Sequence, residues 1–219
     1  MRILAIEGAL GRCSAAMLAD GALVAAAHAE APRGQPSMLP PMARDVLERA
    51  GGAPDIVVVG IGPGGFTGLR AAIALAEGIA HGAGRPLFGI TTGEALLAAL
   101  PDGLRAGRAV WTAIDNKRGR VVLEVFAPHH TIPAPPLVAT LEALPAPDGG
   151  VLVLGDAAAA VVAALHARGE AAEARPGLPD AADVARLAAQ RLQAGLALRA
   201  ATPLYVEPPA VTAARPVPA

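Results

Sequence analysis

The stretch "DIVVVGIGPGGFTGLRAAIALAEGIA", residues 55–80, joins an apolar strand pattern to a long helical pattern through a loop rich in glycine. The aliphatic run before Gly60 predicts a buried strand, and the apolar spacing after the loop predicts a helix over Thr67–Ala83. Gly84 ends this helix, and "PLFGI" follows as the next strand. This order favours parallel strands joined by a right-handed crossover, and therefore an α/β fold.

The glycine loop has two interpretations. Gly60, Gly62 and Gly65 match the spacing G-x-G-x-x-G of dinucleotide-binding loops, but the next strand ends in "GITT" and supplies no acid to hold a ribose. No lysine stands at the helix start to meet a phosphate, and Pro63 removes one amide donor. Either the glycines let the helix N-terminus pack closely on its strand, or they belong to a vestigial anion or nucleotide site. The residues of such a site are Glu7, Gly62, Gly64, Gly65, Thr67 and Asp115.

The segments before this unit predict a meander and a helix. Short apolar runs over residues 2–30 are typical of antiparallel strands. A helix is expected from about Ser37, which would be its N-cap, with Pro40 and Pro41 in its first turn.

The second half of the chain begins like the first. "AVWTAID" and "RVVLEVF" form a hairpin pattern, and a Pro-rich connection leads to the strand "VLVLGD", an Ala-rich helix and a last helix over 181–194. We therefore predict two lobes of related plan. Residues 1–101 form the first lobe, and residues 102–219 form a smaller one with a Pro-rich connection and tail.

Charge and composition exclude some functions. The 219 residues carry a formal net charge of −1 with no basic cluster, so we do not expect the chain to hold RNA by itself. No run approaches the roughly 18 uncharged apolar residues of a membrane span, and no membrane is expected as a partner. One cysteine, Cys13, fits a reducing cytoplasm.

The usual catalytic patterns are also missing. The five histidines contain no H-E-x-x-H arrangement, which argues against a zinc hydrolase. Cys13 lies inside a predicted strand, and neither Ser14 nor Ser37 has the G-x-S-x-G elbow. The sequence therefore predicts no catalytic residue and no metal site.

Two helices carry more apolar surface than one sheet face requires. Either both helices are buried by their own fold, or they offer an apolar face to another protein, with charged residues such as Glu77 at its rim. The apolar positions are Leu39, Met42, Ala43, Val46, Leu69, Ile73 and Ala76.

Several segments, in order over nearly the whole chain, carry a family resemblance. They are "ILAIEGA…CSAAML", "MLPPMARDVLERAG", "DIVVVGIGPGGFTGLRAAIALAEGIAHGAGRPLFGITTGEALL", "WTAIDNKRGRVVLEVF" and "PLYVEPP". Together they resemble the TsaB family, also called YeaZ. The most specific block is Val59–Leu69, and the least specific region is Pro128–Ala182.

The resemblance implies a fold and a role. The fold is the two-lobed actin-like, Hsp70-like ATPase (ASKHA, ribonuclease H-like) fold, each lobe a mixed sheet flanked by helices. The role is that of a non-catalytic subunit, which binds and activates the TsaD transferase in formation of N6-threonylcarbamoyladenosine at position 37 of tRNAs reading ANN codons. A TsaE-like ATPase would join the assembly, and tRNA would be held indirectly, through the complex. ATP, Mg²⁺ and metal are expected on the partner subunits, with no cofactor on this chain.

The family's contact with TsaD is carried over to the two apolar helices. The alternative is that the isolated chain forms a homodimer through the same helices. Met42→Asp or Ile73→Asp is expected to abolish pairing and leave the fold intact. The contact residues are Leu39, Met42, Ala43, Val46, Leu69, Ile73, Ala76 and Glu77.

The chain also departs from the family pattern. Family members usually have Asp-Thr-Ser after the first strand, where this chain has Glu7 followed by Gly-Ala, and a histidine before the first helix is replaced by Gly34 or Gln35. The alternative function is an ATP-dependent phosphotransferase or an acyl hydrolase, as older M22 glycoprotease-like labels for the family suggest. It would place Glu7, Asp115 and the Gly62–Thr67 loop around a metal–nucleotide complex. Ordinary turn carboxylates are the other interpretation of the two acids.

Overall fold

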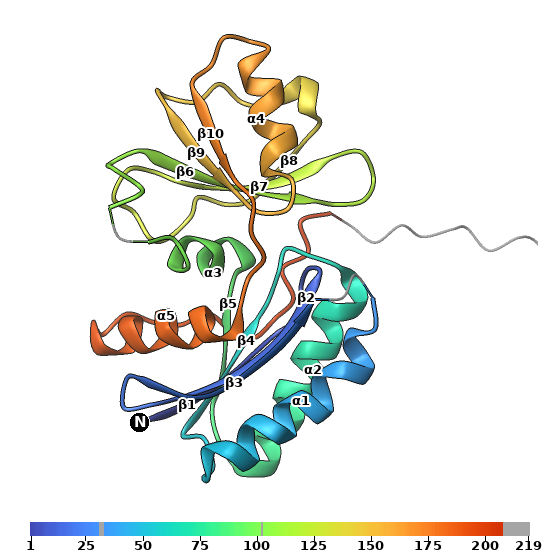
Figure 1. Ribbon diagram of the computed structural model, residues 1–219, viewed down its shortest axis with the longest axis vertical. Helices are drawn as coiled ribbons and strands as arrows, with labels where there is room; N and C mark the ends of the chain where they lie inside the picture. Colours follow the sequence, from blue (N-terminus) through green and yellow to red (C-terminus); the bar gives the residue numbers. More distant parts are fainter. Residues whose placement is uncertain (31–32, 102, 208–219) are drawn as a thin grey trace, which may run out of the picture.

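The computed structural model describes residues 1–30, 33–101 and 103–207, which form two five-stranded sheets, one above the other in Figure 1. The last two prolines of "PLYVEPP" and the Pro-rich tail lie outside these ranges. The first half contains β1 (Arg2–Glu7), β2 (Arg12–Ala19), β3 (Ala22–Glu30), α1 (Gln35–Ala50), β4 (Ile56–Gly60), α2 (Phe66–Ala83), β5 (Leu87–Ile90) and α3 (Thr92–Ala98). The second half contains β6 (Ala109–Asp115), β7 (Val121–Phe126), β8 (Leu137–Ala139), the short 3₁₀ helix η1 (Leu141–Ala143), β9 (Val151–Leu154), α4 (Ala158–His166), β10 (Ala172–Arg175) and α5 (Ala181–Gln193).

The two sheets share one topology. The first has the order β3-β2-β1-β4-β5, in which β1, β2 and β3 are antiparallel and β4 and β5 run parallel to β1. The second has the order β8-β7-β6-β9-β10, with the same alternation of antiparallel and parallel pairs. The prediction of two lobes of related plan is confirmed.

Helices α3 and α5 each cross to the opposite sheet. Helix α3 follows β5 of the first sheet, but its Leu96 packs with Val110 and Leu152 of the second sheet. Helix α5 follows β10 of the second sheet, but it covers the face of the first sheet that carries Ile3 and Leu18. The two helices contact each other between the sheets (Figure 1). The boundary between residues 101 and 102 thus separates the two sheets but not their covering helices, and the assignment of two domains stays a prediction.

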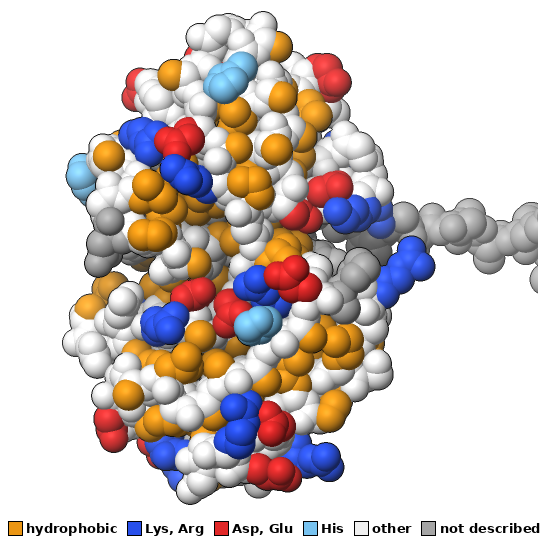
Figure 2. Space-filling model, in the orientation of Figure 1, with side chains coloured by type: hydrophobic (Ala, Val, Ile, Leu, Met, Phe, Trp, Pro, Cys, Tyr) orange, Lys and Arg blue, Asp and Glu red, His pale blue; other side chains and the backbone are white. Residues whose placement is uncertain are grey.

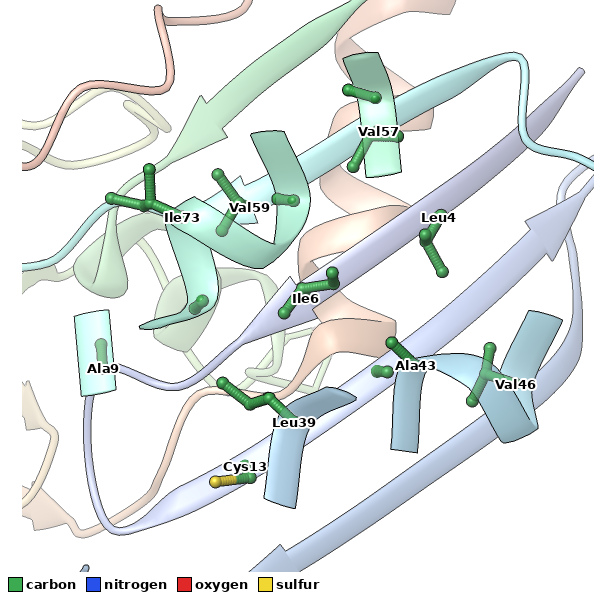
Figure 3. Close-up of a cluster of buried hydrophobic side chains, with 14 of the residues drawn as sticks. Leu4, Ile6, Ala9, Cys13, Leu39, Ala43, Val46, Val57, Val59 and Ile73 are labelled. Atoms are coloured by element: carbon green, nitrogen blue, oxygen red, sulfur yellow. The ribbon is translucent and has the colours of Figure 1, made fainter. Parts of the chain in front are cut away.

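The opposite face of the first sheet carries α1 and α2. Strand β1 is buried on both faces, because its alternate residues point to opposite sides: Leu4 and Ile6 face α1 and α2, and their neighbours face α5. Figure 3 shows Leu4 and Ile6 in one buried cluster with Leu39 and Ala43 of α1 and Ile73 of α2. Aliphatic and alanine side chains build this core, as expected from a chain with 2% aromatic residues.

Helix α1 begins earlier than the sequence predicts. Its first residue is Gln35, and the N-cap is Gly34, at φ 99°, instead of Ser37. The Ser37 hydroxyl lies inside the first turn and donates to the Gly34 carbonyl at 2.9 Å. Because the helix starts early, Pro40 and Pro41 lie inside it and not in its first turn. The expected start was wrong because glycine reaches the left-handed conformation at the helix entrance and the serine does not need to cap.

No helix among the described residues is long and apolar enough to cross a bilayer.

Candidate functional site

The glycine loop between β4 and α2 packs against the turn that follows β1. A side chain at Gly64 would place its Cβ 2.3 Å from the Ala9 carbonyl oxygen, and one at Gly68 would meet the Gly8 carbonyl oxygen at 2.2 Å. The Gly65 N–H donates to the Ala9 carbonyl at 2.6 Å, which fixes the loop to this turn. These glycines therefore serve close packing, but against the turn after β1, whereas one interpretation expected packing on the helix's own strand.

Glu7 is enclosed beneath this loop. Its side chain is fully buried, Oε1 accepts the Ala9 N–H at 2.6 Å, and a Cβ on Gly60 would lie 1.8 Å from Oε2. Within the described ranges Oε2 has no hydrogen-bond partner. Burial raises the pKa of Glu7 to about 7, against the opposing effect of the Ala9 N–H. The acid is therefore largely protonated in mildly acidic solution.

We predict that Glu7→Gln removes part of the protein's pH dependence. The pKa of Glu7 rises on folding from about 4.5 to about 7, so the folded protein holds a proton in this window that the unfolded chain has released. Stability then falls as the pH rises through the window, by up to about 3 kcal/mol for such a shift. Glutamine keeps the shape and cannot ionise, so the fall in unfolding free energy between pH 5 and pH 8, measured in urea, should be about halved in Glu7→Gln.

The remaining half of the fall in unfolding free energy is assigned to Glu124. Burial also raises the pKa of Glu124 to about 7. The control is Glu48→Gln on the exposed side of α1, which should keep the full pH dependence. Equal slopes for Glu7→Gln and the unmodified protein would contradict the prediction.

Asp115, at the end of β6, forms an ion pair with Lys117. Its carboxylate accepts the Lys117 N–H at 2.7 Å and the Lys117 ammonium at 2.9 Å. Burial acts to raise the pKa of Asp115, but these two Lys117 donors outweigh it and hold the pKa below its ordinary value. The same ammonium lies 3.6 Å from Asp156, whose other oxygen accepts the Asp115 N–H at 2.9 Å. The two carboxylates and the lysine form one charged group on the second lobe.

A cavity of about 950 Å³ lies between the glycine loop and this charged group. It brings together four of the six residues predicted for a vestigial site, namely Gly64, Gly65, Thr67 and Asp115. Glu7 and Gly62 are not part of its wall, and Glu7 lies behind the turn after β1. The structure therefore separates the two acids that the alternative enzyme function would use together.

The sequence reasoning missed several residues of the cavity wall. The Arg70 guanidinium stacks 3.8 Å from the centroid of the Phe66 ring, and its Nε donates to the Tyr205 hydroxyl at 2.7 Å. A phenylalanine directly after the glycine loop, Phe66, was a signal for this part of the wall. Tyr205, however, is 135 residues away from Arg70, and no sequence pattern links the two. Other missed residues of the wall include Lys117, Asp156 and Glu207.

A buried ion pair joins α3 to α5 at the junction of the lobes. Arg191 donates to Glu94 Oε1 at 2.9 Å, Arg199 approaches the same oxygen at 3.2 Å, and both Glu94 and Arg191 are buried. Glu94 also completes a capping box, because its Oε2 accepts the Thr91 N–H at 2.9 Å. Burial acts to raise the pKa of Glu94, but Arg191 and the Thr91 N–H outweigh it and lower the pKa. This pair is structural and does not face the cavity.

Most of the predicted partner-contact residues lie in the chain's own core. Six of them are at most 5% exposed, while Met42 is half-buried and Glu77 is exposed. The wide apolar arcs have a physical reason, since α1 and α2 pack against each other as well as against the sheet. Ile73→Asp would place a carboxylate in this core, so the expectation that it leaves the fold intact was wrong. The six buried residues are Leu39, Ala43, Val46, Leu69, Ile73 and Ala76.

An accessible apolar surface nevertheless remains on the two helices, which we name the helix-pair face. It consists of half-buried Leu47 on α1, half-buried Ala71 and Leu75 on α2, and exposed Ala74 and Gly78 on α2. On the face of the molecule in Figure 2, basic side chains alternate with acidic ones. The role of α1 and α2 in binding a partner stays a prediction, now restricted to residues that a partner can reach.

Comparison with known protein sequences gives matches over part of the chain. Residues 29–125 match the family model of TsaD, the tRNA N6-adenosine threonylcarbamoyltransferase. The tRNA threonylcarbamoyladenosine biosynthesis protein TsaB of Escherichia coli K12 is 39% identical over 127 residues, which are 55% of this chain and 53% of that protein. An uncharacterized protein of Mycobacterium tuberculosis is 37% identical over 127 residues, 48% of this chain and 58% of that protein. The chain thus spans about half the length of the curated relatives it matches.

The fold comparison extends over almost the whole chain. The crystal structure of a Pseudomonas aeruginosa protein with similarity to peptidase YeaZ has a TM-score of 0.76 and 25% identity, and covers 94% of this chain and 99% of that one. YeaZ from Pseudomonas aeruginosa gives a TM-score of 0.75 with the same identity and coverage. The predicted actin-like ASKHA fold class is confirmed. Taken with the sequence matches, these structures show that the chain is similar to proteins of the TsaB/YeaZ family.

Proposed function

We propose that this protein is the accessory subunit of a tRNA threonylcarbamoyl transferase, acting in biosynthesis of N6-threonylcarbamoyladenosine at position 37 of tRNAs that read ANN codons. Its proposed role is to bind and activate a TsaD-like subunit without catalysing the transfer. The match to a curated TsaB protein carries the proposal. A TsaE-like ATPase would complete the assembly in the cytoplasm, and nucleotide and metal would be held by the partner subunits.

The geometry of the glycine loop supports an accessory role. An enzyme of the alternative kind would need its acids and its loop around one metal–nucleotide complex. Glu7 is instead enclosed behind the turn after β1, and Asp115 is paired with Lys117. The Gly65 N–H is used by the Ala9 carbonyl, and the space beside Gly64 and Gly68 is filled by Ala9 and Gly8.

The surface that we propose for TsaD is the helix-pair face. Small and aliphatic side chains on two adjacent helices let a partner's helices approach closely, and burial of such a face stabilises a complex by the hydrophobic effect. Charged residues such as Arg44 and Glu77 surround it and would form the polar rim. tRNA would contact the chain indirectly, through the assembled complex.

We predict that Ala74→Arg abolishes this pairing and preserves the fold. Ala74 is exposed, so arginine at this position meets water in the free subunit, but it would bring bulk and an unpaired charge into the interface. The dissociation constant for a TsaD-like subunit from the same source should rise at least about 100-fold, as when a central hot spot is lost. Calorimetry measures the affinity, and mass spectrometry of tRNA nucleosides measures the modification.

The matched control is Ala163→Arg, an exposed alanine in the middle of α4 on the other lobe, which should leave both readouts unchanged. Sedimentation of the isolated chain tests the homodimer alternative, since a dimer through the same face should also dissociate in Ala74→Arg. Unchanged TsaD affinity in Ala74→Arg would exclude the helix-pair face. An unmodified chain that neither binds TsaD nor raises tRNA modification would exclude the proposed function.

A further inference from the structure

We propose that residues 199–207, named the strap, form a latch that holds the two lobes closed over the cavity and opens at its C-terminal end. The strap follows α5 and returns between the lobes (Figure 1). It contacts both lobes in turn, and the two sets of contacts differ in strength.

The first part of the strap is attached to the first lobe. The Gly89 N–H of β5 donates to the Arg199 carbonyl at 2.8 Å, so the strap adds a short antiparallel bridge at the edge of the sheet. The Leu204 N–H donates to the Ile61 carbonyl at 2.8 Å, next to the glycine loop. The Arg199 side chain adds an ion pair with the buried Glu94. This end is fixed by several elements at once.

The middle of the strap lies against the first turns of α2. Tyr205 accepts the hydrogen bond from Arg70, and its ring lies 6.0 Å from that of Phe66. The Arg70 guanidinium is thereby held against both rings, at 3.8 Å and 5.6 Å from their centroids. Cation–π contacts at such partly exposed sites contribute about 0.5–1 kcal/mol each.

The far end of the strap is attached to the second lobe by Glu207 and by half-buried Val206, which packs against the apolar cluster that contains Ile114 and Val122. Glu207 lies 2.6 Å from the Arg120 guanidinium and accepts a hydrogen bond from the Asn116 amide at 2.8 Å. Both partners belong to the turn between β6 and β7. The Arg120 side chain is 44% exposed and that of Glu207 is 19% exposed, and an ion pair in contact with water contributes about 1 kcal/mol or less. This end can therefore release while the rest of the fold remains intact.

The strap is also a wall of the cavity. Leu204, Tyr205, Val206 and Glu207 line it, together with the glycine loop and Asp115. The other junction of the lobes, at α3 and α5, is a packed apolar interface with the buried Glu94–Arg191 pair. A large packed junction on one side, and on the other a partly exposed ion pair with one apolar side chain beside it, are the features of a hinge with a latch. Release of Glu207 would let the lobes separate at the cavity.

The test measures the distance between the lobes. Spin labels are placed at Ala74→Cys on α2 and Ala163→Cys on α4, both exposed, in a Cys13→Ala background, and double electron–electron resonance gives the distribution. The unmodified strap should give one narrow distance. Glu207→Arg, which sets two like charges together, should add a population at longer distance. The double variant Glu207→Arg with Arg120→Glu should restore the narrow distribution.

The control is Glu173→Arg, which breaks ion pairs with Arg108 and Arg175 inside the second lobe and should leave the distance unchanged. Circular dichroism establishes that each variant is folded. An unchanged distribution in Glu207→Arg would overturn the proposal. So would a broad distribution that the charge-swapped double variant fails to narrow, since this would trace the change to general destabilisation.

Discussion

Gly68→Ala is expected to lower the free energy of unfolding by about 2 kcal/mol or more, although alanine is the better helix former by about 1 kcal/mol. Gly68 lies in the first turn of α2, and its added methyl group would meet the Gly8 carbonyl oxygen at 2.2 Å and the Gln35 side chain at 3.1 Å. The carbonyl belongs to the turn after β1 and cannot rotate away, so the helix must shift off the sheet. Urea denaturation followed by circular dichroism measures the loss.

The same helix supplies the control. Gly78 has no atom within 4 Å of the position of an added Cβ, so Gly78→Ala gains helix propensity without a clash. It should raise the unfolding free energy by up to about 1 kcal/mol. The two substitutions are chemically identical and should differ in sign. A Gly68→Ala variant as stable as Gly78→Ala would show that the contact with Gly8 is not tight.

Glu94→Ala is expected to destabilise the protein by about 3–5 kcal/mol, the cost of removing one partner from a buried ion pair. Arg191, only 5% exposed, would keep the Thr131 carbonyl at 3.2 Å but lose its countercharge. The capping box of α3 would be lost as well. Because α3 and α5 join the lobes here, the loss should appear in one cooperative unfolding transition.

A double variant separates the unpaired charge from lost packing. Glu94→Leu with Arg191→Leu replaces both charges by apolar groups and should recover most of the stability. Glu173→Ala removes a carboxylate that pairs with Arg108 and Arg175 at the surface, and should cost far less stability than Glu94→Ala. If Glu94→Ala costs no more than Glu173→Ala, the burial of the pair has no energetic consequence.

The sequence predicts the elements that have strong local patterns. The meander, the glycine loop, α2 and the hairpin of the second half lie within a residue or two of their expected bounds. Strands β8 and β10 were not expected, since one has three residues inside the Pro-rich connection and the other, "AEAR", has no aliphatic run. Local pattern identifies an element only where the element is long or regular.

The site is harder to predict, because its contacts depend on the packing of distant segments. The glycine spacing indicated a special loop, but the partner of Gly64 and Gly68 is the turn at residues 8–9, which only the pairing of β1 with β4 brings near. The apolar arcs of α1 and α2 indicated burial correctly, but periodicity cannot tell which part of an arc the chain covers itself. Of the cavity acids, Asp115 was predicted from its place at a strand end, while Asp156 and Glu207 were missed. The enclosure of Glu7 was not visible in sequence.

The crossing of α3 and α5 has a consequence for dividing the gene. A fragment ending at residue 101 would lack α5 and expose the face of the first sheet that carries Ile3 and Leu18, while the fragment from residue 103 would lack the α3 cover of its own sheet. Each half would thus carry the helix that covers the sheet of the other half. Co-expressed halves should therefore behave as a split protein, unfolded apart and folded together, with assembly of the halves as the readout.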